Sequence, residues 1–179
     1  MFLSACKSSV TGSLNEVSSM RIKSFEFENN GFIPRQFSCD GENVPPVLVF
    51  ENIPSNAKSL ALIVDDPDAP GGTFTHWLVW NIPPTVYELS KNNVNFPQGV
   101  TDFGKIGYGG PCPPSGTHRY FFKLFALDTV LNLEQGASRK QLEQAMQGHI
   151  IEKAELIGKY NSCLLYTSPS PRDLSTSRM

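Results

Sequence analysis

Two short segments of the chain set polar, ionisable side chains against rigid Pro and Gly backbone. The first reads Asp-Asp-Pro-Asp-Ala-Pro over residues 65–70 and is followed by His76. The second reads Gly-Tyr-Gly-Gly-Pro-Cys-Pro-Pro over residues 107–114 and is followed by His118. Pro and Gly fix tight turns, and imidazole nitrogens can donate hydrogen bonds to phosphate oxygens. The two segments therefore favour a small preformed pocket for an anion.

The roles of the individual side chains follow partly from their positions. Asp68 lies in a turn after Pro67, where an Asp ordinarily bonds the backbone two residues on, and we expect it to play that local role. A single His at a strand start, such as His76, is more often a structural hydrogen-bond partner than a ligand. Because side chains alternate along a strand, His118 and Tyr120 share one face, and Arg119 on the other is expected to be a surface or ion-pair residue.

The elements that must position these residues are mostly β-strands. Apolar runs of four to eight residues bounded by Gly, Pro and Asp are typical of strands buried in a sandwich. Such runs occupy residues 22–27, 47–50, 58–64, 76–82 and 118–127. The sequence therefore predicts an antiparallel β-sandwich with one or two peripheral helices near the C-terminus.

One helix is predicted after Ser138, which can cap it together with Gln141 three residues on. Apolar and other core-facing positions follow at helical spacing. They are Leu142, Ala145, Met146, His149 and Ile150. Residues 153–159 are expected to form a last element against the sheet.

The two ends of the chain are set apart from the domain, which we place at residues 21–162. Leu3-Ser4-Ala5-Cys6 has the residue types of a lipoprotein cleavage box, so residues 1–20 are interpreted as a truncated lipoprotein signal and tether, with Cys6 as the lipidation site. Residues 163–179 are interpreted as translated read-through of a transposon-based sequencing adapter. The protein is then periplasmic or membrane-anchored if Cys6 is lipidated, and otherwise cytoplasmic.

Composition excludes some classes of function. The chain has 15 basic and 17 acidic residues, and the tail from residue 163 holds two of the Arg and one of the Asp. A net negative chain of this kind is not a nucleic-acid binder by charge. Without the end segments, one domain with a sizeable core remains.

Two cysteines, Cys39 and Cys112, lie within the predicted domain. If they pair, the disulfide closes a long loop and stabilises the fold by about 4 kcal/mol on the chain-entropy model. If they are free, Cys112 beside a His-containing pocket would be a candidate reactive thiol. Both alternatives stay open.

In order and spacing, these segments resemble the phosphatidylethanolamine-binding protein family, also called Raf kinase inhibitor-like proteins, and specifically its bacterial branch. The resemblance covers about residues 22–160 and includes four further motifs. These are Phe-Ser-Cys-Asp-Gly-Glu-Asn at 37–43, Trp-Asn-Ile-Pro at 80–83, Thr-Asp-Phe-Gly at 101–104 and Leu-Phe-Ala-Leu-Asp at 124–128. The resemblance implies a β-sandwich with a small anion-binding cavity.

The resemblance also implies which residues form that cavity. It places Asp66, His76, His118 and Tyr120 in the ligand site and Pro70, Gly110 and Pro111 in its walls, and Asp68 is kept as a further candidate. The backbone N–H groups of Gly109 and Gly110 are expected to add donors. Asp66 beside an anion makes sense if it is protonated, accepts a proton from a monoanionic phosphate, or faces the ammonium of a zwitterionic headgroup.

The leading interpretation is a binding protein without catalysis, cofactor or metal, holding a phosphate-like or phospholipid-headgroup ligand and regulating a kinase or protease. Binding should vary between about pH 5 and 8, where imidazole changes charge. A homodimer is expected from the resemblance. One alternative is a metal-dependent hydrolase that uses the Asp and His cluster. Another is an envelope-tethered interaction protein. No HExxH motif or phosphate-binding P-loop supports an enzyme.

Overall fold

The protein, seen in a computed structural model that describes residues 19–162, is a β-sandwich of two unequal sheets. The larger sheet has the strand order β2-β8-β7-β4-β5 and the smaller one β1-β3-β6. The strands are β1 (Arg21–Ser24), β2 (Gly31–Phe32), β3 (Leu48–Glu51), β4 (Ser59–Asp66), β5 (Phe74–Ile82), β6 (Glu88–Leu89), β7 (Thr117–Leu127) and β8 (Ile150–Asn161). All pairs are antiparallel except β2 with β8, so the predicted sandwich is confirmed with one parallel pair added.

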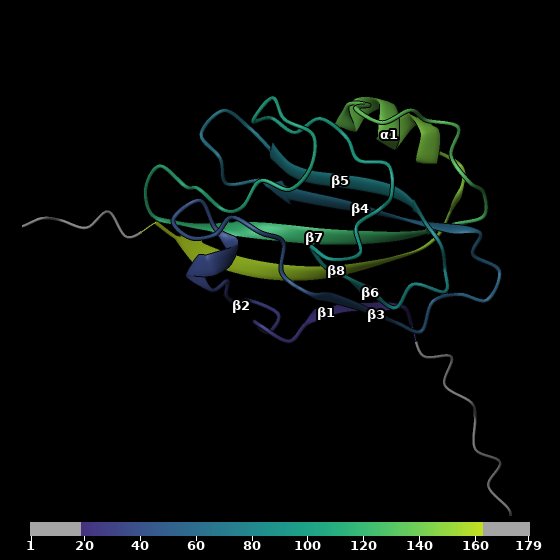
Figure 1. Cartoon of the computed structure of the whole chain (residues 1–179), viewed down its shortest axis with the longest axis horizontal. Coiled ribbons are helices and arrows are strands. Elements are labelled where there is room, and N and C mark those ends of the chain that lie inside the picture. Colours follow the sequence, from purple (N-terminus) through teal and green to yellow (C-terminus); the bar gives the residue numbers. More distant parts are fainter. Residues whose placement is uncertain (1–18, 163–179) are drawn as a thin grey trace, which may run out of the picture.

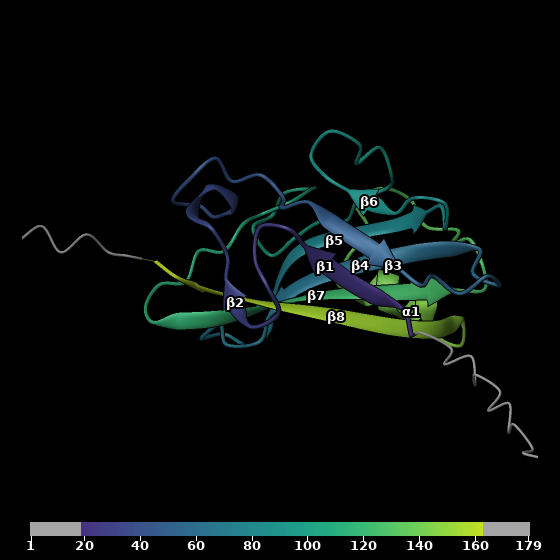
Figure 2. The same ribbon diagram turned by 90° about the horizontal axis from the view of Figure 1, so that it is seen from below.

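The large sheet is covered on both faces. Figure 2 shows β1 and β3 lying across one face, with α1 (Arg139–Met146) on the far side. All eight residues of β4 are buried for this reason. Its Leu60, Leu62 and Val64 pack between the sheets, while Ala61 and Ile63 pack toward α1. Because side chains alternate between the two faces of β4, this one strand contributes residues to two separate hydrophobic clusters.

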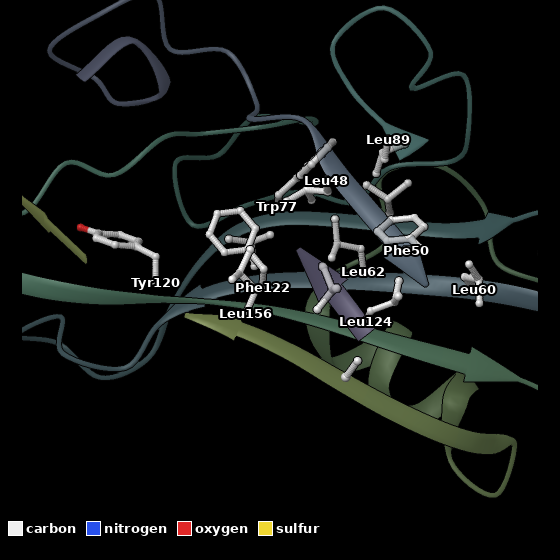
Figure 3. Close-up of a cluster of buried hydrophobic side chains, with 14 of the residues drawn as sticks. Leu48, Phe50, Leu60, Leu62, Trp77, Leu89, Tyr120, Phe122, Leu124 and Leu156 are labelled. Carbon is white, nitrogen blue, oxygen red and sulfur yellow. The ribbon is translucent and has the colours of Figure 1, made fainter. Parts of the chain in front are cut away.

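The core between the sheets consists of aliphatic and aromatic side chains from both layers (Figure 3). Leu48 and Phe50 of β3 meet Trp77 of β5 and Phe122 of β7 there. Tyr120 lies at one end of this cluster, and its hydroxyl points away from the other labelled side chains. The core therefore ends where the polar candidate residues begin.

The helix α1 begins as predicted and ends earlier. The Ser138 side chain accepts a hydrogen bond from the backbone of Gln141 while the Gln141 side chain binds back to Ser138, which is a complete capping box. The chain leaves the helix at Gln147, whose ψ of 126° is extended, and Gly148 then takes φ +81°, which favours glycine. His149 and Ile150 are therefore not helical, which corrects that part of the prediction. Ile150 instead opens β8.

Two further differences concern the ends of the fold. β8 is longer than the predicted 153–159 element and pairs along the whole of β7 (Figure 1). A short 3-10 helix, η1 (Arg35–Phe37), lies toward the N-terminus rather than near the C-terminus. Cys6, the proposed tether and the segment from residue 163 lie outside the described residues. No helix within residues 19–162 is long and apolar enough to cross a membrane.

Candidate functional site

A cavity of about 170 Å³ lies at the end of the sandwich where β4 finishes and β5 and β7 start. Its lining brings together four of the predicted ligand residues and residues of the 103–114 loop. The lining residues are Asp66, Ala69, Pro70, Phe74, His76, Phe103, Cys112, Pro113, Pro114, His118 and Tyr120. A space of this size suits a phosphate group or a small headgroup, because pockets for larger organic ligands usually exceed about 300 Å³.

Asp66 is the last residue of β4 and uses both carboxylate oxygens. Oδ1 accepts the backbone N–H of Asp68 at 2.8 Å, and Oδ2 lies 2.7 Å from Nδ1 of His118. Both side chains of the Asp66–His118 pair are buried. Asp66, and not Asp68, therefore accepts the turn hydrogen bond expected of this motif, while it also orients His118.

Asp68 is turned away from the cavity toward Arg119. The Arg119 guanidinium donates to both carboxylate oxygens, from Nη2 at 2.7 Å and Nε at 2.9 Å, and the Arg119 backbone N–H donates at 3.0 Å. The hydrogen bond from the Arg119 side chain is the main cause that lowers the pKa of Asp68 from 3.8 to about 2. Asp68 is not among the residues that line the cavity, and Arg119 takes the ion-pair position expected of it.

His76 is held by the backbone of the 107–114 segment. Its Nδ1 lies 2.7 Å from the carbonyl oxygen of Gly109, and the Gly109 N–H donates to the His76 carbonyl at 2.9 Å. A carbonyl oxygen only accepts, so Nδ1 carries the hydrogen and Nε2 is the nitrogen left for the cavity. Burial lowers the pKa of His76 in spite of the Gly109 bond, which favours the neutral ring at neutral pH.

Tyr120 contributes a hydroxyl that lies beside the Asp66 carboxylate and the Cys112 backbone N–H without forming a hydrogen bond of good geometry to either. The residue is 1% exposed, and its ring meets that of His76 edge-on at 5.1 Å. Within residues 19–162 the hydroxyl has no hydrogen-bond partner. Burial and the negative charge of Asp66 raise the pKa of Tyr120, so it remains a neutral donor. A buried hydroxyl without a partner is costly, and most such groups in proteins are satisfied.

The predicted wall residues are only partly where we expected them. Pro70 lines the cavity, but Gly110 and Pro111 are not among the described residues that line it. The Gly110 N–H donates to Asn43 Oδ1 at 2.7 Å, and the Pro111 carbonyl accepts from the Cys39 N–H. The N–H of Gly109 is likewise bound, to His76. The expectation that the Gly109 and Gly110 amides face the anion is therefore wrong, because both already have protein acceptors.

The 103–114 loop is fixed in place by a disulfide and by close packing. Cys39 and Cys112 are joined, with Cα atoms 5.4 Å apart, and Cys112 is part of the cavity wall. A side chain on Gly109 would collide with the Phe103 ring, so only Gly leaves room for this ring against the loop. Phe103 in turn contacts His76 and Phe74 edge-on.

Sequence reasoning about roles missed several apolar wall residues, namely Ala69, Phe74, Phe103, Pro113 and Pro114. The Thr-Asp-Phe-Gly motif at 101–104 belongs to the family resemblance and contains Phe103, but its residue types did not indicate that Phe103 lines the cavity. Asp102 of the same motif accepts the Thr75 backbone N–H at 2.6 Å, which holds the loop beside the start of β5. Such loop contacts cannot be read from residue types.

Two other observations bear on where chemistry could occur. A larger cavity of about 500 Å³ lies between β1 and β8, but no His is among its lining residues. Within the described residues, no group of three or more His, Cys, Asp or Glu is placed to hold a metal ion.

Known proteins resemble the chain over this same region. The sequence profile of the phosphatidylethanolamine-binding protein family matches residues 23–161. A UPF0098 protein of the archaeon Methanothermobacter thermautotrophicus is 51% identical over 148 residues, which are 79% of this chain and 98% of that protein. A UPF0098 protein of Pyrococcus horikoshii is 52% identical over 160 residues, covering 83% and 80%. Because these relatives are archaeal, the resemblance is not confined to a bacterial branch.

Solved structures agree with the sequence matches. A phosphatidylethanolamine-binding protein homologue from Chlamydia trachomatis superposes with a TM-score of 0.78 at 44% identity, covering 80% of this chain and 97% of that one. E. coli YbcL, described as a member of the mammalian family, gives a TM-score of 0.75 at 31% identity, covering 80% and 99%. By sequence and by fold, the chain belongs to the phosphatidylethanolamine-binding protein family.

Proposed function

We propose that the protein binds a phosphate-like group in the cavity formed by Asp66, His76, His118 and Tyr120, without catalysing a reaction on it. The observation that carries this proposal is the Tyr120 hydroxyl, which is buried and has no partner within residues 19–162. A ligand oxygen accepting from it would satisfy the group. Membership of the family supports a binding protein as opposed to an enzyme.

The histidines supply the remaining polar contacts. In both rings Nδ1 makes the hydrogen bond within the protein, to the Gly109 carbonyl from His76 and to Asp66 from His118, so Nε2 is the ring nitrogen left for a ligand. In its protonated form His118 can donate from Nε2 to an anion while Asp66 balances its charge. This accounts for a carboxylate beside an anion site, because Asp66 serves as the partner of His118.

The size and shape of the site limit the ligand. About 170 Å³ accommodates a phosphate or phosphorylated headgroup but no acyl chain. Cys112 is held in the disulfide, so it is not available as a thiol nucleophile. Regulation of a kinase or protease by this pocket, through capture of a phosphorylated segment, is part of the proposal and rests on the family resemblance.

The test compares two chemically equal substitutions. His118→Asn keeps an amide N–H where Nδ1 faces Asp66 and removes Nε2. His149→Asn makes the same change at an exposed pair, where Nδ1 of His149 lies 2.8 Å from Asp128. Titration calorimetry with phosphate and phosphoethanolamine at pH 6 is expected to show a loss of roughly tenfold or more for His118→Asn, as for a hydrogen bond to a charged group.

The control variant should bind as tightly as the native protein. Equal affinities for all three proteins would place the binding site elsewhere, and no binding by the native protein would refute the proposed function. Thermal unfolding of each variant, followed by circular dichroism, separates a lost ligand contact from a lost fold.

A further inference from the structure

Residues 112–116 form a short segment that leads into β7 and supplies one wall of the cavity. Cys112, Pro113 and Pro114 are among the lining residues, and Pro113 is buried there. The other four residues of the segment are exposed. We call residues 112–116 the wall segment. On this side, the cavity is thus separated from solvent by one short stretch of chain.

The chain on either side of the wall segment is fixed by hydrogen bonds. Before it, the Gly110 N–H donates to Asn43 Oδ1 at 2.7 Å, and the Pro111 carbonyl accepts from the Cys39 N–H at 3.0 Å. After it, Thr117 is the first residue of β7, which pairs with β8 along its whole length. A movement of the wall segment would leave both of these ends in place.

A disulfide is what ties the wall segment to the rest of the fold. Within residues 19–162, no residue of this segment forms a hydrogen bond of good geometry to another residue. The Cys39–Cys112 bond joins the segment to the loop that follows η1. Both cysteines are exposed, so a thiol in solution can reach the bond. The buried side chain of Pro113 adds apolar contact only.

Gly116 provides a point about which the wall segment can turn. It has φ +71°, and a Cβ built on it would meet no atom within 4 Å. Glycine passes between backbone conformations with little steric cost. Pro113 and Pro114, in contrast, have a fixed φ and keep the middle of the segment stiff. Once the disulfide is cut, this stiff stretch can move as a unit away from the cavity.

We infer that the Cys39–Cys112 disulfide is a redox-sensitive latch on the cavity. With the bond intact, the wall segment is held against the cavity. With the bond reduced, the segment is released and the cavity opens toward solvent, which admits groups larger than the closed space of about 170 Å³. The inference goes beyond the proposed function, because it concerns access to the cavity and not the ligand.

The chemistry is thiol–disulfide exchange with an external dithiol. One thiolate of the dithiol attacks a sulfur of the Cys39–Cys112 bond and forms a mixed disulfide, while the other cysteine sulfur leaves as a thiolate and takes up a proton. The second thiolate of the dithiol then attacks the mixed disulfide and releases the remaining cysteine. The dithiol is oxidised to its disulfide, and the protein gains two thiols. Reducing compartments favour this open form, and oxidising compartments favour the closed form.

The first measurement is reduction of the folded protein by dithiothreitol without denaturant. Labelling with iodoacetamide followed by peptide mapping is expected to find Cys39 and Cys112 as free thiols, while circular dichroism retains the signal of the β-sandwich. A bond that is reduced only in denaturant, or a sandwich signal that is lost on reduction, would overturn the inference.

The second measurement is the reactivity of the three histidines toward diethyl pyrocarbonate, which must reach an imidazole nitrogen. His76 and His118 are 3% and 7% exposed, whereas the side chain of His149 is 47% exposed and serves as the internal control. In Cys39→Ser/Cys112→Ser the rates at His76 and His118 should rise by roughly tenfold, because the wall segment then opens locally. The rate at His149 should not change. The reduced native protein should behave as this variant does, and reoxidation should restore the slow rates.

Asp65→Asn is the matched control for a general loss of stability. It keeps the disulfide but loses a buried carboxylate that pairs with Lys123 and Arg139, a change of comparable cost. His76 and His118 should react in it as slowly as in the native protein. Equal acceleration in both variants would show general unfolding, and unchanged rates in the Ser variant would show a fixed wall; either result overturns the inference. Failure of the native protein to bind phosphate would refute the proposed function alone.

Discussion

Removing the hydroxyl of Tyr120 should make the protein more stable and a weaker binder. The residue is 1% exposed and its hydroxyl has no partner within residues 19–162. An unsatisfied buried polar group costs about 1–3 kcal/mol. The low end applies because the hydroxyl borders a cavity that water can enter. Tyr120→Phe is therefore expected to raise the free energy of unfolding by about 1 kcal/mol.

For a domain of this size, that gain corresponds to a rise in Tm of about 4 °C. The same change removes a donor to a charged ligand and should weaken phosphate binding by roughly tenfold. Tyr108→Phe is the matched control, since the Tyr108 hydroxyl donates to the Phe37 carbonyl at 2.8 Å. Its loss should lower stability by about 1 kcal/mol and leave phosphate affinity unchanged.

Differential scanning calorimetry gives the two Tm values, and titration calorimetry gives the affinities. A fall in Tm for Tyr120→Phe comparable to that for Tyr108→Phe would show that the Tyr120 hydroxyl is bonded inside the protein. A raised Tm with unchanged phosphate affinity would show that the hydroxyl is free but not part of the ligand site. Either result refutes the reasoning behind the proposed function.

Three further predictions concern stability. Replacing Cys39 and Cys112 together with Ser should lower the free energy of unfolding by about 4 kcal/mol in urea denaturation, because the bond spans 73 residues; a reductant should weaken the native protein and not the variant. Arg119 lowers the pKa of Asp68 from 3.8 to about 2, so this pairing stabilises the fold above pH 4 and is lost as the pH falls through about 2. The Tm of Asp68→Asn should accordingly fall less than that of the native protein between pH 5 and pH 2. Asp65 is fully buried against two cations, so Asp65→Asn should cost about 3 kcal/mol in urea denaturation. Phosphate affinity should not change in that variant, since the side chain is absent from the cavity lining.

The strands could be predicted because a strand that is buried on both faces reads as a nearly continuous run of apolar residues. β4 and β7 are near-continuous apolar runs; β4 ends at Asp66, and β7 carries His118 and Tyr120 near its start, and these three residues line the cavity. The face shared by His118 and Tyr120 followed from alternation alone. The capping residues Ser138 and Gln141 likewise fixed the helix start by a local rule.

The remaining parts depended on contacts between distant segments. Residue types did not show that Asp68 would pair with Arg119, 51 residues away, or that the Gly110 N–H would be taken by Asn43. The irregularity in the pairing of β4 with β5 beside Asn81 was likewise not predicted, because it depends on the distant Leu131. Asn81 has φ +55°, and its side chain both donates to the Leu131 carbonyl and accepts from the Leu131 N–H. Only the folded arrangement decides which polar groups keep a hydrogen-bonding position free, and within residues 19–162 the Tyr120 hydroxyl is one of three buried side-chain atoms without a partner.

The pairing of β7 with β8 has a consequence for synthesis of the chain. β8 ends at Asn161 and pairs along β7 from Thr117 to Leu127, so a nascent chain that stops before residue 150 has β7 as an open edge. A long unpaired edge of this kind is a site of aggregation. The ribosome must therefore release β8 before the strand that carries His118 and Tyr120 is protected. A chain that terminates prematurely within α1 or β8 would expose the edge of β7, and we expect it to be bound by chaperones or degraded by proteases.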